Sequence, residues 1–170
     1  MDTPQLRPMT TDDLELVLAW RNHPEVRRYM YTQHEISLAE HTAWFARADQ
    51  QPGRHLLILE ADQLPQGFVN LYESGPGGIA EWGCYIAPDA PRGTGQRLGR
   101  SLLHYAFGEL GLHKLCGQAL GFNTRSIGFH QRLGFSQEGV LRDQHHDGQQ
   151  YHDIVCFGLL ASEWQASLEK

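Results

Sequence analysis

Apolar and polar residues follow two different periods along the chain. Three runs read as strands: the β-like run 55–61 and the alternating runs 67–73 and 79–86. Short turn-rich links join them, which predicts an antiparallel meander. A helical period follows over about 96–110. Its recurring apolar positions are Leu98, Leu102, Leu103, Ala106, Phe107 and Leu110.

Helix start signals predict three further helices. Ser, Thr and Asn side chains accept hydrogen bonds from first-turn N–H groups, and acidic residues in that turn complement the helix dipole. Glycine after the last turn marks an end. Thr10 or Thr11 precedes a helix predicted over 12–22, and the capping box of Ser37 with Glu40 precedes one over 38–48. Asn123 precedes a third helix over 124–133, and Gly134 marks the end of that helix.

The remaining segments complete a mixed sheet. A short strand is expected near Leu6 and another over 113–120, and a short helix over about 162–168. Strands 135–146 and 149–159 flank Asp147-Gly148, a two-residue hairpin signal. The order β-α-α-β-β-β-α-β-α-β-β-α predicts an α/β or α+β fold with a mixed sheet. Because no linker divides the sequence, we expect one domain over 1–170.

Composition narrows the class of protein. The formal charge is −6, with 41% hydrophobic and 20% charged residues, which is typical of a soluble globule and argues against a nucleic-acid or anionic-membrane binder. Cys84, Cys116 and Cys156 are widely spaced and predict reduced thiols in a cytoplasmic protein. The acidic start lacks an apolar signal region, and no apolar run approaches the ~20 residues of a membrane span.

A glycine-rich turn precedes the helix at 96–110. Gly93 and Gly95 stand before the helix and Gly99 inside it. A strand, a glycine turn and a helix N-terminus together suit an anion, because free N–H groups and the dipole point at the ligand. The run GTGQRLG matches neither the dinucleotide fingerprint nor the Walker A motif. Spacing alone leaves a phosphate site and a plain tight turn open.

The wider context resembles the GCN5-related N-acetyltransferase family over essentially the whole chain. In that family a loop Arg/Gln-x-x-Gly-x-Gly/Ala binds the pyrophosphate of acetyl-CoA. A later segment, Asn-x-x-Ala/Ser followed by Tyr-x-Lys/Arg-x-Gly-Phe, forms the second part of the cofactor site. The matching residues here are Arg92, Gly95, Asn123, Ser126, Arg132, Gly134 and Phe135.

The resemblance implies a seven-stranded, mostly antiparallel mixed sheet flanked by about four to five helices, with a splayed central strand pair. It implies direct acetyl transfer from acetyl-CoA, the co-substrate, to an amine without a metal. The expected cofactor-binding residues are Cys84, Tyr85, Ile86, Arg92, Gly93, Thr94, Gly95, Gln96, Arg97, Asn123, Ser126, Phe129 and Arg132.

Two positions depart from the family pattern. Arg97 stands where the loop has Gly or Ala, and His130 stands where the later helix has Tyr. Arg97 keeps its backbone N–H, so its side chain either adds a cation to the phosphate site or faces solvent. His130 either donates a proton to the departing thiolate or is a histidine satisfied on a helix face.

The attacking amine must lose a proton, which calls for a base. Glu81, in the otherwise apolar run 79–86, is the first candidate, and the alternative is a strand residue facing solvent or a cation. Glu81 and His130 are therefore the predicted catalytic residues. A covalent route through Cys84 or Cys116 lacks a His–Asp partner, and buried strand cysteines are usually inert.

The hairpin carries a cluster of histidines and aspartates. With a two-residue turn, His145 faces Gln150 and Asp143 faces His152, so Asp143, His145 and His152 share one face. Three such ligands could bind zinc. A polar rim around the substrate, or plain exposed residues, is the preferred interpretation, and no metal is predicted.

The acceptor is less defined than the donor. The run RNHPEVRRYM with HEIS-x-x-EH-x-x-W resembles the subgroup that acetylates a UDP-linked 4-amino-4,6-dideoxy sugar, a step of pseudaminic acid synthesis that supplies flagellin glycosylation. Alternatives are a ribosomal-protein-type N-terminal acetyltransferase and a non-catalytic acyl-CoA sensor. A homodimer is left open. The expected substrate-binding residues are Arg21, Asn22, Tyr31, His34, Trp82, His145 and His152.

Overall fold

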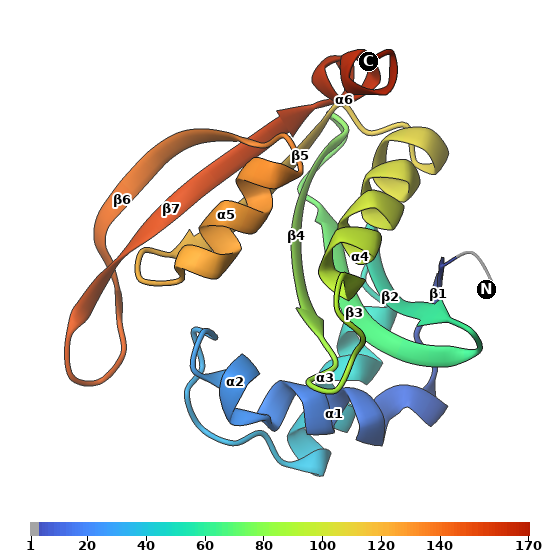
Figure 1. The fold of residues 1–170 in the computed structure, drawn as a ribbon. Coiled ribbons are helices and arrows are strands. Elements are labelled where there is room, and N and C mark those ends of the chain that lie inside the picture. Colours follow the sequence, from blue (N-terminus) through green and yellow to red (C-terminus); the bar gives the residue numbers. More distant parts are fainter. Residues whose placement is uncertain (1–3) are drawn as a thin grey trace. The chain divides into compact units, whose positions relative to one another are not determined.

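The computed structural model describes residues 4–170 and contains a seven-stranded sheet of order β1-β2-β3-β4-β5-β7-β6 (Figure 1). The strands are β1 (Gln5–Pro8), β2 (Arg54–Ala61), β3 (Leu64–Glu73), β4 (Ile79–Ile86), β5 (Lys114–Leu120), β6 (Ser136–His146) and β7 (Tyr151–Leu160). The helices are η1 (Thr11–Asp13), α1 (Leu14–Asn22), α2 (Pro24–Arg27), α3 (Leu38–Asp49), α4 (Thr94–Leu103), the π-helical η2 (His104–Glu109), α5 (Thr124–Arg132) and α6 (Ala161–Leu168).

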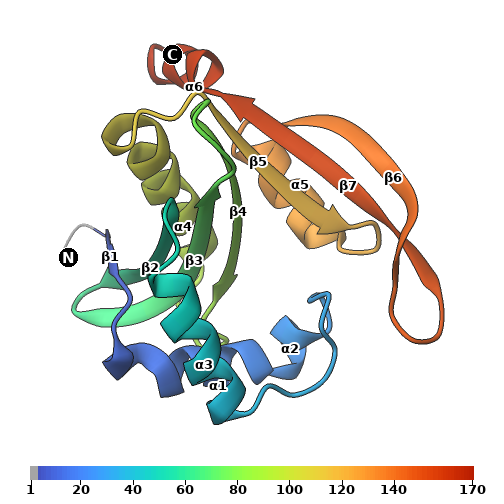
Figure 2. The same cartoon turned by 180° about the vertical axis from the view of Figure 1, so that it is seen from behind.

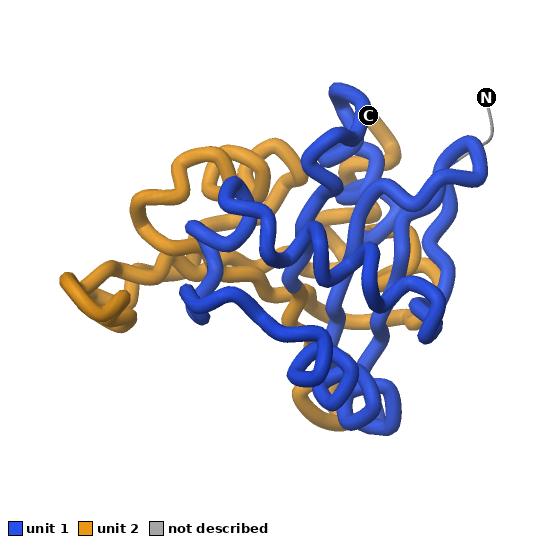
Figure 3. The backbone as a smooth tube through the Cα atoms, turned by 90° about the horizontal axis from the view of Figure 1, so that it is seen from below, with its two compact units in different colours: residues 1–72, 83–102 blue, residues 73–82, 103–170 orange. Residues whose placement is uncertain are grey.

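The chain folds as two compact units, coloured separately in Figure 3. Unit 1 takes the chain up to Tyr72 together with Gly83–Leu102, and unit 2 takes Glu73–Trp82 and Leu103–Lys170. Strand β4 therefore contributes to both. Among the helices within residues 4–170, none has the length and apolar character needed to cross a bilayer.

Unit 1 is an antiparallel set of strands with helices on both faces. Strand β2 pairs with β1 and with β3. Figures 1 and 2 show α4 on one face of these strands and α3 on the other. Gly67 makes the first contact possible, because a Cβ there would lie 2.7 Å from Leu98 Cδ1 of α4.

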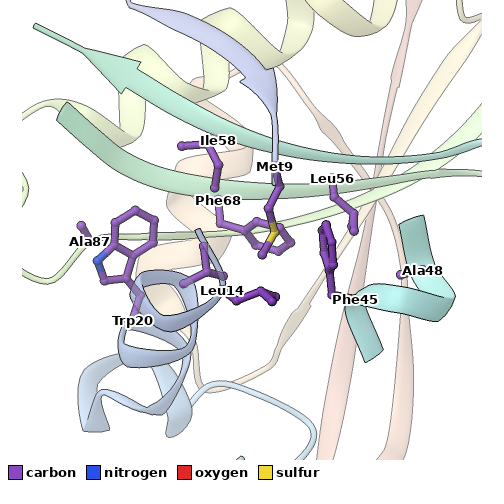
Figure 4. Packing of buried hydrophobic residues seen from close by; sticks show 10 residues of the cluster. Met9, Leu14, Trp20, Phe45, Ala48, Leu56, Ile58, Phe68 and Ala87 are labelled. Carbon is purple, nitrogen blue, oxygen red and sulfur yellow. The ribbon is translucent and has the colours of Figure 1, made fainter. Parts of the chain in front are cut away.

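The apolar core of unit 1 lies between the strands and helices α1 and α3 (Figure 4). Phe68 of β3 is buried in it and contacts the rings of Trp44 and Tyr85, with centroids 6.0 and 5.0 Å away. Close-packed aromatic rings of this kind dominate core energetics. The buried members are Met9, Leu14, Val17, Trp20, Phe45, Ala48, Leu56, Ile58, Phe68 and Ala87.

The predicted capping box of α3 in unit 1 is confirmed, whereas Thr10 precedes the 3₁₀ turn η1 and its side chain makes no capping hydrogen bond. Ser37 Oγ accepts from the N–H of Glu40 at 3.1 Å, and Glu40 Oε2 accepts from the N–H of Ser37 at 2.9 Å. The short α2 was not expected. His23 caps it through Nδ1, and Pro24 fits its first position.

Unit 2 joins the central strands to the long hairpin. The parallel pairing of β4 with β5 covers three residue pairs, Ile79–Glu81 with Lys114–Cys116. Strand β5 then pairs with β7, and β7 with β6, both antiparallel. Helix α5 contacts β5 and β6, and Figure 1 shows it lying along the hairpin. The mixed seven-stranded sheet is thus as predicted.

Three expectations about the elements were wrong in detail. The helix expected over 96–110 begins at Thr94 and changes to the π form from His104. The described chain has six α-helices rather than four to five. The turn of the hairpin lies at Gly148-Gln149 rather than Asp147-Gly148, because the N–H of Asp147 donates to Gln150 O while Asp147 Oδ1 accepts from the N–H groups of Gln149 and Gln150.

This displacement of the turn by one residue shifts the register of the hairpin. His145 pairs with His152, and His146 with Tyr151. The predicted pairings of His145 with Gln150 and of Asp143 with His152 are therefore wrong. Asp143 lies in an irregular stretch with φ 51°, and its N–H donates to Asp153 Oδ1.

Phe68→Ala tests the core of unit 1. Removing the ring leaves a cavity beside Trp44 and Tyr85, so the free energy of unfolding should fall by about 3–5 kcal/mol. Urea denaturation followed by tryptophan fluorescence measures it. Leu64→Ala on the same strand, 64% exposed, is the control and should change little. Equal effects would contradict this packing.

Candidate active site

In unit 1 the glycine-rich turn opens α4 as an anion-binding geometry requires. Gly93 has φ +90°, a conformation that favours glycine. The N–H of Thr94 donates to Pro91 O, and that of Arg97 to Gly93 O. Between them, Gly95 and Gln96 carry first-turn amides, for which a helix supplies no acceptor. The predicted role of these two amides in binding an anion stays a prediction.

The Arg97 side chain folds back onto this turn. Its Nη2 donates to Thr94 Oγ1 at 2.8 Å and reaches Gln66 Oε1 of β3 at 3.5 Å. Thr94 is buried, and its hydroxyl donates to Pro91 O at 2.7 Å. Arg97 Nε is buried without an acceptor among the described residues. A cation is unfavourable at the positive end of a helix, so this placement favours an anion beside it.

The end of β4 in unit 1 supplies backbone rather than reactive side chains. Burial raises the pKa of the Cys84 thiol to about 12, which leaves no thiolate near neutral pH. Burial also raises the pKa of Tyr85. Both side chains are therefore neutral, and the predicted contribution of Cys84, Tyr85 and Ile86 through their main chain stays a prediction.

In unit 2, residues of α5 and its N-cap form hydrogen bonds with one another. Asn123 Oδ1 accepts from the N–H of Ser126 at 3.1 Å, as the cap signal predicted. The Ser126 carbonyl then accepts from His130 Nδ1 at 2.8 Å. Arg132 folds over Gly128 on the same helix, with Nη1 3.0 Å from where a Cβ would stand. The helix therefore holds the His130 ring in one orientation.

His130 is enclosed by aromatic rings and is 4% exposed. It stacks on Phe157 with centroids 4.7 Å apart and an interplanar angle of 7°. Phe135 meets it edge-on at 5.2 Å, and Trp82 lies tilted at 5.3 Å. Burial lowers the pKa of His130, against the weaker opposing effect of the Ser126 carbonyl. The ring is neutral near neutral pH.

Gly117 of β5 makes this arrangement possible. A Cβ there would collide with His130 Nε2 and lie 2.8 Å from Trp82 Nε1. Glycine inside a strand signals such a close approach, although the sequence analysis did not use it. Gly117 is thus a residue of the candidate site that sequence reasoning missed.

Glu81 lies on the other face of the sheet. It pairs with Cys116, and neighbouring strand residues point to opposite faces, so Cys116 faces away from the His130 side of Gly117. Burial raises the pKa of Cys116, and the charges of Glu138 and Glu81 add to the effect. Glu81 is exposed, and no ion pair of it occurs within residues 4–170. The two predicted catalytic residues are therefore not brought together.

The hairpin histidines form a separate group. His145 and His152 stack at 6.5 Å, and His152 Nε2 lies 2.7 Å from Asp147 Oδ2. Amide hydrogen bonds, with that from Gln150 first, lower the pKa of Asp147, and His152 adds to them. His152 lies five residues along β7 from Phe157, about 17 Å at the usual rise. These side chains cannot meet the His130 ring.

Metal-ligating geometry is not found within the described chain: no three His, Cys, Asp or Glu side chains of residues 4–170 come together as a metal site. The register shift explains this for the hairpin. Asp143 was expected beside His145 and His152. Instead, its backbone N–H donates to Asp153 Oδ1.

The predicted acceptor residues of unit 1 differ in their exposure and in their hydrogen bonds to other residues. The side-chain amide of Asn22 donates to the Ile36 carbonyl and accepts from the Ile36 N–H, both at 2.8 Å. His34 is exposed and lies 3.1 Å from Glu40. Tyr31 is 48% exposed. Asn22 therefore holds the loop that carries His34 and Tyr31.

Arg21 and His41 are buried polar side chains in the same unit. Arg21 Nη2 donates to Thr32 O at 3.1 Å, while its Nη1 and His41 Nε2 lack partners within the described part of the chain. His41 stacks on Trp44 at 5.2 Å. Burial lowers the pKa of both Arg21 and His41, and the charge of Arg21 lowers that of His41 further. His41, three residues before Trp44, belongs to the run HEIS-x-x-EH-x-x-W on which the acceptor prediction rests.

Comparison with known proteins places these features in a family. The family described as Acetyltransferase (GNAT) domain matches residues 5–136. Acetyltransferase PseH of Campylobacter jejuni (strain 81-176) is 26% identical over 141 residues, covering 81% of this chain and 86% of that protein. Spermidine N(1)-acetyltransferase of Escherichia coli K12 is 26% identical over 164 residues, covering 95% and 88%.

The fold agrees with solved structures. A crystal structure of spermidine N-acetyltransferase from Vibrio cholerae, in complex with CoA and spermine, superposes with a TM-score of 0.86. The two chains are 22% identical and overlap over 96% of this chain and 98% of that one. At this identity the likeness establishes the fold.

Arg97→Ala tests the turn at α4. Losing the contacts to Thr94 and Gln66 should loosen the turn and remove a cation, weakening CoA binding about tenfold. Isothermal titration calorimetry with CoA measures the Kd. Arg100→Ala, exposed on the same helix, is the matched control and should bind CoA normally. Unchanged affinity in Arg97→Ala would assign this side chain no part in the cofactor site.

Proposed function

Because the chain belongs to the GNAT acetyltransferase family, and so transfers acetyl from acetyl-CoA to an amine, we propose that its acceptor is a nucleotide-linked amino sugar. The specific acceptor is the 4-amino group of a UDP-linked 4-amino-4,6-dideoxy sugar. The reaction would belong to pseudaminic acid synthesis in the cytoplasm and supply flagellin glycosylation. The PseH relatives, 26% and 27% identical, support this choice.

The observation that carries the proposal is the buried, unpaired Arg21. It is 9% exposed and has no ion pair among the described residues, while its Nη1 lacks an acceptor. Taking a cation out of water costs several kcal/mol unless an anion compensates it. The planar guanidinium suits a phosphate. A diphosphate-bearing acceptor would supply that anion, which a free polyamine cannot do.

The glutamates of the segment 21–41 also favour an anionic acceptor over a polyamine. In the acceptor segment, 21–41, three of them already have cationic or histidine partners. Glu35 lies 3.7 Å from Arg27, Glu25 lies 3.6 Å from Arg28, and Glu40 lies 3.1 Å from His34. A polycation would need carboxylates that are not already paired.

A polyamine acceptor is the second candidate. The E. coli spermidine acetyltransferase is as similar in identity as PseH and covers more of this chain, 95% against 81%. Glu81, exposed and without an ion pair in the described part of the chain, could attract an ammonium group. This candidate explains Glu81 but leaves Arg21 without a counter-ion.

Glu81 serves as the base under either acceptor. An ammonium has no lone pair, so it must lose one proton before it attacks the thioester. A solvated carboxylate can take this proton and return it to water. The exposed position of Glu81 suits this role.

A direct assay decides between the acceptors. Purified protein and acetyl-CoA are incubated with the UDP-4-amino sugar, spermidine or a ribosomal-protein N-terminal peptide, and CoA release and acetylated product are measured. We expect the highest kcat/KM for the nucleotide sugar. Preference for spermidine or the peptide would replace the proposed acceptor, and binding of acetyl-CoA without any transfer would indicate a sensor.

Arg21→Lys tests the phosphate contact. Lysine keeps the charge but loses the second nitrogen, so KM for the UDP sugar should rise about tenfold while KM for acetyl-CoA stays unchanged. Arg28→Lys, at the exposed residue that follows α2, is the control. Circular dichroism confirms folding. An unchanged KM for the sugar would remove Arg21 from the acceptor site.

Glu81→Gln tests the base. The amide cannot accept a proton, so kcat should fall about 10²-fold near neutral pH and recover partly at high pH, where the amine is deprotonated in solution. Steady-state kinetics across pH measures this. Glu138→Gln is the control, since Glu138 lies on the same face but is bound to Lys114 at 2.8 Å. Equal kcat in Glu81→Gln and wild type would exclude this base.

A further inference from the structure

The loop between α2 and α3 in unit 1 has little burial of its own. Residues 31–35 are all exposed and belong to no helix or strand, and Figure 2 shows the chain passing from α2 to α3 through them. A segment with few buried contacts opens at a low cost in free energy unless side chains from other elements hold it. Contacts that reach this loop from α1 therefore help to decide how well its position is defined.

Two neighbouring residues at the end of α1 make such contacts. The Asn22 amide forms a pair of hydrogen bonds with the backbone of Ile36, one as donor and one as acceptor, both 2.8 Å long. Arg21 Nη2 donates to the Thr32 carbonyl at 3.1 Å. Asn22 and Ile36 are half-buried, which strengthens their hydrogen bonds relative to those on an open surface. The last turn of α1 thus holds the loop at Thr32 and at Ile36.

The contact with Thr32 also fixes the orientation of Arg21. A guanidinium is planar, so the position of Nη2 and the plane of the group together set the direction of Nη1. Nη1 is buried and lacks an acceptor among the described residues. If the loop moved away, Nη2 would lose its acceptor too, and the side chain would turn toward other partners because an unpaired buried donor is costly. The loop position and the direction of Nη1 are therefore coupled.

Other contacts of the loop connect it to different elements. Gln33 donates to the carbonyl of Met30, which follows α2. Glu35 lies 3.7 Å from Arg27 of α2, and its side chain is 75% exposed, so solvent screens this pair. These contacts shape the loop or join it to α2, whereas Asn22 joins it to α1.

We propose that Asn22 is a positioning residue for the acceptor: by holding the loop at Ile36, it keeps the Thr32 carbonyl on Arg21 and aims Nη1 at the acceptor's phosphate. This role rests on the proposed function, in which Arg21 binds that phosphate. It differs from the role predicted from the sequence, in which Asn22 binds the acceptor directly. The oxygen and the nitrogen of the amide are both already bonded to Ile36, which favours the indirect role.

The hydrogen bonds to Ile36 are tested without activity. Amide hydrogen exchange, followed by NMR, is compared in wild type and Asn22→Ala. Exchange of the Ile36 N–H should become about tenfold faster because its acceptor is lost, while the amides of β2 and β3 stay protected. Gln33→Ala, which removes a side-chain contact within the loop, is the control and should leave Ile36 unchanged. Unchanged exchange at Ile36 in Asn22→Ala would overturn the proposal, whatever acceptor the enzyme uses.

Steady-state kinetics with acetyl-CoA and the UDP-4-amino sugar test the effect on the acceptor. Asn22→Ala should raise KM for the sugar about fivefold and leave kcat and KM for acetyl-CoA unchanged, because only the orientation of Arg21 is lost. Gln33→Ala should behave as wild type. An unchanged KM for the sugar would overturn the proposal. A lower kcat together with a higher KM for both substrates would instead show a general structural role and would also overturn it.

A double-mutant cycle separates positioning from direct contact. If Asn22 acts through Arg21, adding Asn22→Ala to Arg21→Lys should raise KM for the sugar no further than Arg21→Lys alone. Effects that multiply would show that Asn22 contacts the acceptor independently, and the positioning role would then be wrong.

Failure of the proposed function gives a different result. If the enzyme acetylates spermidine or the peptide but not the UDP sugar, the phosphate contact of Arg21 is wrong, and the positioning role of Asn22 falls with it. Exchange at Ile36 would still show whether Asn22 holds the loop. If the sugar is acetylated and its KM does not respond to Asn22→Ala, the proposed function stands and the positioning role alone is overturned.

Discussion

The packing of His130 in unit 2 depends on a strand position without a side chain. At Gly117 the backbone of β5 is bare, and His130 and Trp82 close onto it from α5 and β4. Any larger residue would push the imidazole off Phe157, on which it stacks. Protein interiors resist such displacement because they are close-packed. One missing Cβ thus sets the position, the burial and, through Ser126, the tautomer of His130.

In unit 1 a charged residue, Arg97, fixes the position of the glycine-rich turn. An arginine in the first turn of α4 is opposed by the helix dipole, yet Arg97 is tied to Thr94 and lies beside Gln66. Thr94 is in turn tied to Pro91. The side chain therefore reinforces the turn from inside while its charge stays at the helix N-terminus. Stiffening and anion attraction are combined in one residue.

The sequence was informative where structure is local. Caps at Ser37 and Asn123 depend on residues three apart, and both were confirmed. The predicted hairpin register was wrong because the two-residue turn could lie at Asp147-Gly148 or one residue later, and only the observed hydrogen bonds of Asp147 distinguish the two. The neighbours of Arg97 and His130 could not be predicted at all. Gln66 and Gly117 are brought to them by strand pairing between distant segments.

The β4–β5 ladder separates two groups of opposite character. Under the proposed function the substrate ammonium must lose a proton before attack, and Glu81 on the exposed face can exchange that proton with water. His130 lies against the other face, enclosed by Trp82, Phe135 and Phe157 and kept neutral by burial. One strand pair therefore carries a solvated carboxylate on one side and a desolvated imidazole on the other, and only the carboxylate can exchange protons freely with solvent.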